Sequence, residues 1–155
     1  MNIKNPKLLI ACILLCEAAG ILGSLFTFSS IPTWYKTLVK PDFSPPNWIF
    51  GPVWTTLYAL MGASLYLIIL KVKNNKKAVA IFLLHLLLNT LWSIVFFGLK
   101  DITRALAVIV VLWIMILYII ISFAKIDKKA AIILLPYLAW VSFATLLNYS
   151  LWRLN

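Results

Sequence analysis

Long runs without a charged residue constrain this chain more than any other feature of its sequence. Four runs contain no charge at all, and a fifth is interrupted only by Glu17. The runs cover residues 8–28, 43–70, 78–99, 105–124 and 130–152. Each reaches the roughly 20 residues with which an α-helix crosses about 30 Å of hydrocarbon, and a helix satisfies its own backbone hydrogen bonds there. We therefore expect an all-α integral membrane protein with a bundle of five transmembrane helices.

The expected helices cover about 8–28, 46–70, 79–97, 104–124 and 130–152 of the 155 residues. Little chain is left over, so residues 1–155 are expected to form one membrane domain. Three connectors are short, which favours an up-and-down bundle, and Pro136 should kink the fifth helix because proline removes a backbone hydrogen bond. The first run is longer than the 7–15 residues of a signal-peptide core, so we expect it to be retained.

The charge distribution excludes one class of partner and predicts an orientation. The net charge is +10, but the basic residues lie in short connectors rather than in one stripe, so we expect no nucleic-acid partner. Nine lysines lie at the N-terminus and in residues 71–77 and 125–129, against five basic residues at the opposite helix ends. The positive-inside rule then predicts a cytoplasmic N-terminus. Twelve of the 14 basic residues are lysine, which we interpret as typical of a bacterial protein, here in the cell membrane.

The first connector is unusual, because it is about seventeen residues long and rich in rings. Together with the start of the second helix it reads WYKTLVKPDFSPPNWIFGPVWTTLYALMG over residues 34–62, with three of the seven tryptophans and four of the seven prolines. The prolines restrict the backbone, so we expect an ordered connector, and long ordered connections are usually functional. The pattern predicts a lid from Trp34 to Trp48 and a pocket wall from Trp54 to Met61.

Polar, aromatic and small residues recur at helical spacing on four of the expected helices. Each set falls on one helix face, which should turn inward because polar groups exposed to lipid are costly. The sets are Glu17, Gly20 and Ser24; Trp54, Tyr58, Met61 and Leu65; His85, Asn89, Trp92 and Phe96; and Tyr137, Trp140, Ala144, Asn148 and Trp152. The faces predict an interior pocket for a flat, apolar ligand. The alternative is that the polar residues only tie helices together and that terminal tryptophans only anchor the chain at the interface.

Few side chains in this sequence could carry chemistry. Glu17 has no basic partner within any span, so it is either protonated or hydrogen-bonded inside the bundle, and it could serve proton-coupled transport. His85 could ligate haem iron, although a helix–helix hydrogen bond is the favoured interpretation. Cys12 and Cys16 lack a second Cys or His pair, so we expect buried apolar residues and no metal site. No nucleophile–base pair, phosphate loop or carboxylate pair is present, so neither a required cofactor nor a classical catalytic site is expected.

Three blocks of this sequence resemble the tryptophan-rich sensory protein / translocator protein family, once called the peripheral-type benzodiazepine receptor. The blocks are residues 34–62, quoted above, LNTLWSIVFFG at 88–98 and PYLAWVSFATLLNYSLWRLN at 136–155. The resemblance implies a homodimer of five-helix bundles. It also implies a membrane receptor for tetrapyrroles such as protoporphyrin IX and haem, and for synthetic isoquinoline carboxamides or benzodiazepines, linked to porphyrin homeostasis or stress. One departure is His85, where the family block leads us to expect Gln.

The resemblance also implies which residues touch the ligand. Carried over by position, they are Trp34, Trp48, Trp54, Tyr58, Asn89, Trp92, Trp140, Phe143, Ala144, Leu147 and Asn148. A cholesterol-like motif maps to Leu147, Tyr149 and Arg153, a weak pattern. Two alternatives stay open: light- and oxygen-dependent porphyrin degradation, with Trp54 and Trp140 as candidate redox relays, and a porphyrin or small-molecule transporter that uses Glu17.

Overall fold

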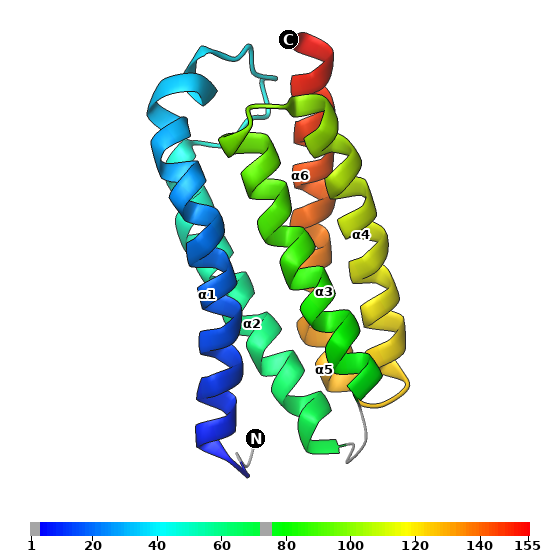
Figure 1. Ribbon diagram of the computed structural model, residues 1–155. Helices are drawn as coiled ribbons and strands as arrows, with labels where there is room; N and C mark the ends of the chain where they lie inside the picture. The colour runs from blue at the N-terminus through cyan, green and yellow to red at the C-terminus, as the bar shows by residue number, and fades with distance from the viewer. Residues whose placement is uncertain (1–3, 72–75) are drawn as a thin grey trace.

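A computed structural model describes residues 4–71 and 76–155, and within them the chain forms only helices and their connectors (Figure 1). Five helical segments are long and apolar enough to cross a membrane. The five-helix integral membrane fold expected from the sequence is therefore confirmed. The elements are α1 (Pro6–Ser30), η1 (Ile31–Tyr35), η2 (Asn47–Ile49), α2 (Phe50–Lys71), α3 (Lys76–Ser93), η3 (Ile94–Gly98), α4 (Ile102–Ala124), α5 (Lys128–Ile133) and α6 (Leu135–Leu154).

The first span continues well past residue 28, where we expected it to end. The π-helical turn η1 extends α1 to Tyr35, and two more helical residues follow, so the irregular connector is confined to residues 38–46. The polar residues near the expected end do not break the helix, because their hydroxyls bond back to carbonyls one turn earlier. Thr27 donates to Gly23 at 3.2 Å and Thr33 donates to Ser29 at 2.8 Å. Trp34 therefore lies on a helix and not in the connector.

The fifth span is interrupted, as expected from Pro136. Residues up to Ile133 form α5, Leu134 separates the two helices, and α6 begins at Leu135. The interruption places Pro136 in the first turn of α6, where a missing N–H group costs nothing because no intrahelical acceptor is available there. The kink predicted from the sequence is thus a short break between two helices.

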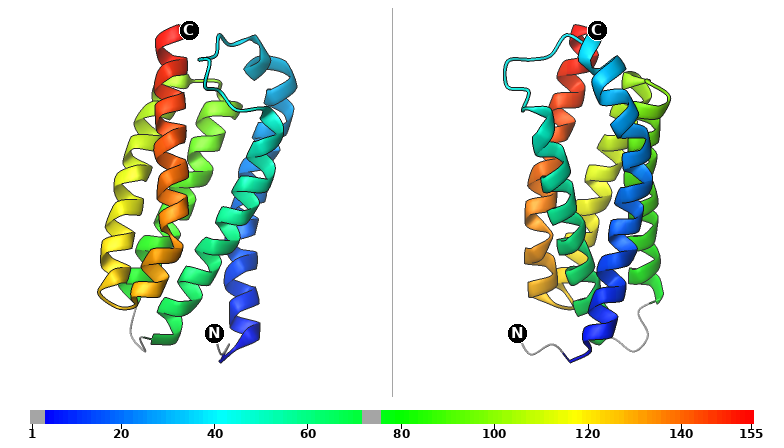
Figure 2. Two further views of the ribbon diagram at one scale, coloured as in Figure 1. Left: turned by 180° about the vertical axis from the view of Figure 1, so that it is seen from behind. Right: turned by 90° about the vertical axis from the view of Figure 1, so that its left-hand side faces the viewer.

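The helices pack unevenly along the bundle. α1 packs against α2 and α3, α4 packs against α3 and α6, and α2 packs against α5 but makes few contacts with α6. Figure 2 shows α2 close to α5 near the N-terminus and separated from α6 near the C-terminus. We call the half that contains the chain's N-terminus and α5 the N-terminal end, and the half that contains residues 38–46 and the C-terminus the connector end.

Close backbone contact holds α1 and α2 together within the bundle. A Cβ atom built on Gly62 would lie 2.5 Å from the Cα atom of Ile13 and 2.8 Å from the carbonyl oxygen of Cys12. Real side chains do not approach backbone atoms so closely, so only glycine allows the two helices to cross here. The crossing also buries the thiols of Cys12 and Cys16.

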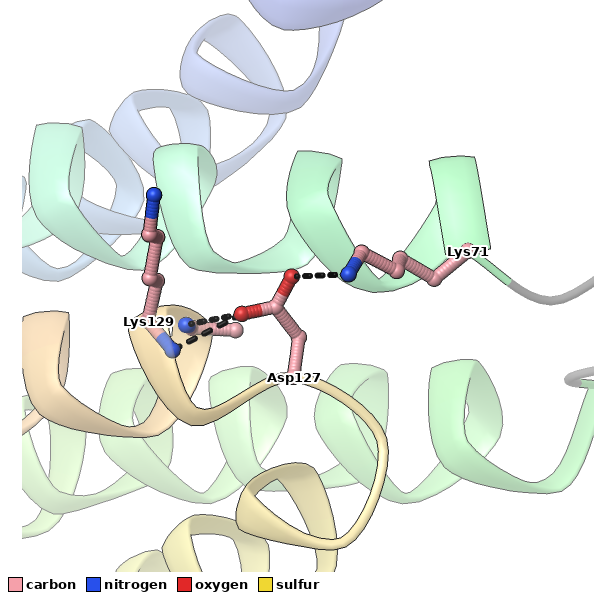
Figure 3. A network of polar contacts seen from close by, with 4 residues as sticks. Lys71, Asp127 and Lys129 are labelled. Carbon is pink, nitrogen blue, oxygen red and sulfur yellow. Dashed lines mark hydrogen bonds and ion pairs between the residues drawn. The ribbon is translucent and has the colours of Figure 1, made fainter.

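Polar contacts join α2 to the start of α5 at the N-terminal end (Figure 3). The Asp127 carboxylate accepts hydrogen bonds from the Lys129 N–H at 2.7 Å and the Ala130 N–H at 3.4 Å, and pairs with the Lys71 ammonium at 3.3 Å. Burial of Asp127 raises the pKa of its carboxyl, but these donors outweigh burial and hold the pKa below the ordinary value of 3.8. Ser64 donates to the Ala130 carbonyl at 2.8 Å and adds a second tie.

Candidate ligand-binding cavity

A cavity of about 430 Å³ lies in the connector end of the bundle. Its lining comes from α1 and η1, from η2 and α2, from the end of α3 with η3, and from α6, whereas α4 contributes nothing. The cavity occupies the space where α2 and α6 are separated, and both large rings and small residues such as Gly20, Ser24 and Ala144 line it. Its volume falls within the roughly 300–1,000 Å³ typical of small-molecule sites.

Aromatic rings from three helices form the walls. Trp54 and Tyr58 on α2 lie with ring centroids 5.7 Å apart, and Trp92 stacks on Phe96 at 5.4 Å. Trp140 on α6 faces these rings, and it meets Phe50 of α2 edge-on at 6.2 Å. The stripes at helical spacing in the sequence thus converge on one space. Such walls present flat apolar surface on opposite sides, which suits a flat aromatic ligand.

One side of the cavity is open. The exposed residues of its lining all belong to α1, η2 and the first turns of α2, whereas the lining from α3, η3 and α6 is buried or half-buried. Phe28 on α1 is 75% exposed and Trp48 on η2 is 73% exposed. These apolar side chains flank an opening between α1 and the η2–α2 segment.

Two of the asparagines in or beside the cavity, Asn89 and Asn148, are engaged in hydrogen bonds with other parts of the bundle. Tyr58 donates to the Asn89 side-chain oxygen at 2.6 Å, and the Asn89 amide donates to the Tyr137 hydroxyl at 2.7 Å. The Trp92 indole N–H donates to Asn148 at 3.1 Å, and the Asn148 amide donates to the Ile102 carbonyl at 3.2 Å. These bonds fix the rings of Tyr58 and Trp92 from behind, so the aromatic walls are held in place.

Two polar groups that line the cavity have no partner. Among the described residues, only the Tyr35 hydroxyl and the Trp140 indole nitrogen are buried side-chain polar atoms without a hydrogen bond. An unsatisfied buried donor costs about 1–3 kcal/mol, so a ligand that supplies an acceptor would gain that much in principle. The cavity is therefore an apolar slot with two fixed donors.

The remaining candidates for chemistry lie in different places. Glu17 lines the cavity and forms no ion pair with any residue in the described ranges. His85 does not line it: the side chain is buried beside Phe82 and Tyr137, with its ring nitrogen bonded to the Phe82 carbonyl. Its ring nitrogen thus bonds to a carbonyl of its own helix, whereas we expected a partner on another helix; haem ligation by His85 stays an untested alternative.

Comparison with known proteins assigns the chain to a family. The TspO/MBR family model matches residues 12–153. The chain belongs to the TspO/MBR family. It is 43% identical to the tryptophan-rich protein TspO of Chlorobaculum tepidum, over 98% of both chains. It is 36% identical to the tryptophan-rich sensory protein of Cereibacter sphaeroides, over 90% of this chain and 86% of that one. It is also 36% identical to the human translocator protein, over 86% and 82%.

In this TspO/MBR protein the cavity gathers most of the residues predicted to touch a ligand. Those in its lining are Trp48, Trp54, Tyr58, Trp92, Trp140, Ala144, Leu147 and Asn148. Three others lie behind or beside it: Asn89 contacts the hydroxyl of Tyr58, Trp34 packs against Phe96, and Phe143 packs against Trp140. Trp54 and Trp140 both line the cavity, and their role as redox relays stays a prediction.

The cholesterol-like motif does not form one surface of the cavity. Leu147 is buried and lines it, whereas Tyr149 and Arg153 are exposed and lie outside its lining. Positions two apart on a helix point in different directions, so Leu147 and Tyr149 cannot share one face.

Sequence reasoning missed Tyr35 as a residue of this TspO/MBR cavity, because it fell in the expected connector. A signal was present. Ser24, Phe28, Ile31 and Tyr35 follow i, i+4, i+7 and i+11 spacing, and all four line the cavity. Extending the first helix to residue 35 would have placed the tyrosine on the same face as Ser24.

Proposed function

We propose that the protein is a membrane receptor that binds tetrapyrroles such as protoporphyrin IX and haem, in a sensory role linked to porphyrin homeostasis or stress. Two relatives, named as a tryptophan-rich sensory protein and a translocator protein, support a receptor or sensory role at the membrane. Isoquinoline carboxamides or benzodiazepines are the synthetic ligands that the same site would take, since both offer flat rings and hydrogen-bond acceptors.

One observation carries the proposal: an apolar cavity is walled by the rings of Trp54, Trp92 and Trp140 and is open between α1 and the η2–α2 segment. A porphyrin is a flat aromatic molecule with little solubility in water, so it partitions into the membrane before it meets the protein. Indole faces on opposite walls can stack on such a ring, and aromatic pairs contribute about 0.5–1.5 kcal/mol beyond the area they bury.

The test is a titration of the purified protein with protoporphyrin IX in lipid nanodiscs, followed by the porphyrin's own absorbance. This signal does not depend on the number of tryptophans, so variants are directly comparable. Trp54→Ala and Trp140→Ala should each weaken binding roughly tenfold, by the loss of a stacking wall. Trp152→Ala is the matched control, because Trp152 is 43% exposed and lies outside the lining. Binding that does not saturate, or that all three variants alter equally, would overturn the proposal.

Glu17 favours one second candidate, a proton-coupled transporter for the same ligands. Its carboxyl lines the cavity without an ion pair in the described chain, so a proton and a ligand could bind there alternately. The measurement is the pH dependence of protoporphyrin IX affinity in wild type and in Glu17→Gln. A transport role requires the substitution to abolish that dependence, and an unchanged pH profile removes Glu17 from any such mechanism.

A further inference from the structure

The unpartnered hydroxyl of Tyr35 marks one end of the cavity. Tyr35 is only 2% exposed, and its ring is held between Phe96 at 6.2 Å and Phe97 at 5.8 Å. The direction of the hydroxyl is therefore set by packing and not by a hydrogen bond. Ser44 of the connector lies close enough to interact with this hydroxyl, but the contact does not have hydrogen-bond geometry. A fixed, buried donor that lines a cavity is suited to an acceptor on a ligand.

A positive charge lies against the same ring. The Lys40 ammonium is 4.6 Å from the centroid of the Tyr35 ring, and Lys40 forms no ion pair with any residue that the structure describes. The backbone next to it is held in place, since the Val39 N–H donates to the Asn155 side chain at 2.9 Å and the Asn155 amide donates to the Val39 carbonyl at 3.0 Å. Lys40 is thus positioned over Tyr35 rather than on a free loop.

The two ends of the cavity differ in charge. Glu17 lies about 27 Å from Tyr35 along the first span, by the rise of roughly 1.5 Å per helical residue. Glu17 brings no positive charge to its end, and when ionised it repels an anion. Lys40 and the Tyr35 donor lie at the connector end. An anionic group on a ligand is therefore favoured at the connector end, with the apolar body of the ligand below it.

We propose that the cavity selects aromatic ligands that carry a carboxylate, with one carboxylate oxygen accepting from the Tyr35 hydroxyl and the Lys40 ammonium compensating the charge. This inference rests on the proposed function and adds an orientation to it: the carboxylate points to the connector end and the rings lie against Trp54 and Trp140. Hydrogen bonds to a charged acceptor are stronger than neutral ones, so acids should be preferred over their esters.

A pair of probes with the same ring system tests this inference. Protoporphyrin IX carries two carboxylates, and its dimethyl ester carries none. Both are titrated into nanodiscs of zwitterionic lipid, with wild type, Tyr35→Phe and Lys40→Gln. Neither lysine belongs to the lining, and Lys36→Gln is the matched control because Lys36 is an exposed lysine close by in the sequence, whereas the ammonium that lies over the Tyr35 ring is that of Lys40. Each variant is compared with wild type for the same probe, which cancels differences in how acid and ester partition into lipid.

The inference predicts that Tyr35→Phe weakens acid binding roughly three- to tenfold and ester binding less, since an ester oxygen is a weaker acceptor. Lys40→Gln should weaken binding of the acid about threefold and leave binding of the ester unchanged. Lys36→Gln should leave the binding of both probes unchanged. Thermal unfolding confirms that each variant is folded; Tyr35→Phe breaks no hydrogen bond in the structure.

The outcomes separate the two proposals. One outcome is that binding of both the acid and the ester saturates on wild type while the variants leave the ratio of the acid affinity to the ester affinity unchanged. In that case this inference is overturned and the receptor function stands. If neither probe saturates on wild type, the receptor function fails and this inference fails with it. Both proposals are supported if Tyr35→Phe and Lys40→Gln lower the ratio of the acid affinity to the ester affinity and Lys36→Gln does not.

Discussion

The two ends of the bundle are built from the same apolar helices, but one is solid and the other is hollow. At the N-terminal end, α2 packs against α5 and is tied to it by Ser64 and Lys71. At the connector end, α2 and α6 part, and the rings of Trp54 and Trp140 line the space between them. Small residues allow helix backbones to touch, whereas large rings hold them apart. Large rings also fill the closed end, where Tyr66, Phe82 and Phe123 are fully buried, so the separation of α2 from α6 marks the open end and ring size alone does not.

Among the residues that the structure describes, the buried polar groups outside the cavity also differ from those in its lining, because the former are paired and two of the latter are not. Behind the cavity wall, Tyr58, Asn89 and Tyr137 satisfy one another, and at the N-terminal end Asp127 accepts from three donors. Inside the cavity, Tyr35 and Trp140 are left without partners. Paired polar groups hold the structure together, and unpaired ones are available to a ligand. Four sets of substitutions test this contrast, taken from the largest expected effect to the smallest.

Gly62→Leu should have the largest effect, a loss of more than about 3 kcal/mol of stability or failure to fold. A side chain there meets the backbone of Ile13 and Cys12, which cannot move aside as a side chain could. Thermal unfolding in detergent measures the change. Gly51→Ala is the control at the connector end, because a Cβ on Gly51 meets nothing within 4 Å and alanine favours the helix. Equal melting temperatures for the two variants would contradict the contrast between the ends.

Asp127→Ala should cost about 1–2 kcal/mol, since it removes the N-cap of α5 and the ion pair with the exposed Lys71. Asp127→Asn keeps a capping oxygen and should lose less. Because the pKa of Asp127 is lowered in the folded protein, the stability that its charge adds is present above pH 3.8 and is lost as the pH falls below it. The melting temperatures of wild type and Asp127→Asn should therefore converge below about pH 4; a constant difference would assign the effect to something other than this charge.

Tyr58→Phe and Tyr35→Phe form a matched pair across the cavity. Tyr58→Phe removes the donor to Asn89 and should destabilise the protein by about 1 kcal/mol, within the range measured for hydrogen bonds between membrane helices. Tyr35→Phe removes no hydrogen bond and should leave the melting temperature unchanged or slightly higher. The comparison fails if Tyr35→Phe destabilises the protein as much as Tyr58→Phe does.

Asn155→Ala should have the smallest effect on global stability, about 0.5 kcal/mol, because its bonds to Val39 are exposed to solvent. Its effect should be local. Hydrogen exchange at the Val39 amide should become faster, whereas exchange in α2 and α4 stays as in wild type. Ser150→Ala serves as control, since Ser150 bonds only to its own helix. Unchanged exchange at Val39 would mean that other contacts order the connector.

Much of the candidate site was predictable from periodicity. Trp54, Tyr58, Trp92, Trp140 and Asn148 follow helical spacing, and all of them line the cavity. Asn89 shows the limit of that reasoning: it lies on the same face as Trp92, but its amide bonds to two tyrosine hydroxyls behind the wall. A helix face is wide enough to meet a cavity with one residue and a neighbouring helix with the next. Which residue does which depends on the positions of the other helices.

The charge-free runs by themselves determined that this chain crosses a membrane five times, because hydrocarbon admits only helices with few charges. The three sequence blocks at 34–62, 88–98 and 136–155 identified the family to which the chain belongs. Only the tertiary structure decided that the first helix continues to Tyr35: Ser29 donates to a carbonyl of its own helix, but Ser30 donates to the Phe97 carbonyl of η3 at 2.6 Å. Only the packing decided which polar groups are paired and which are left open, because hydrogen bonds between helices depend on distances that no single helix encodes.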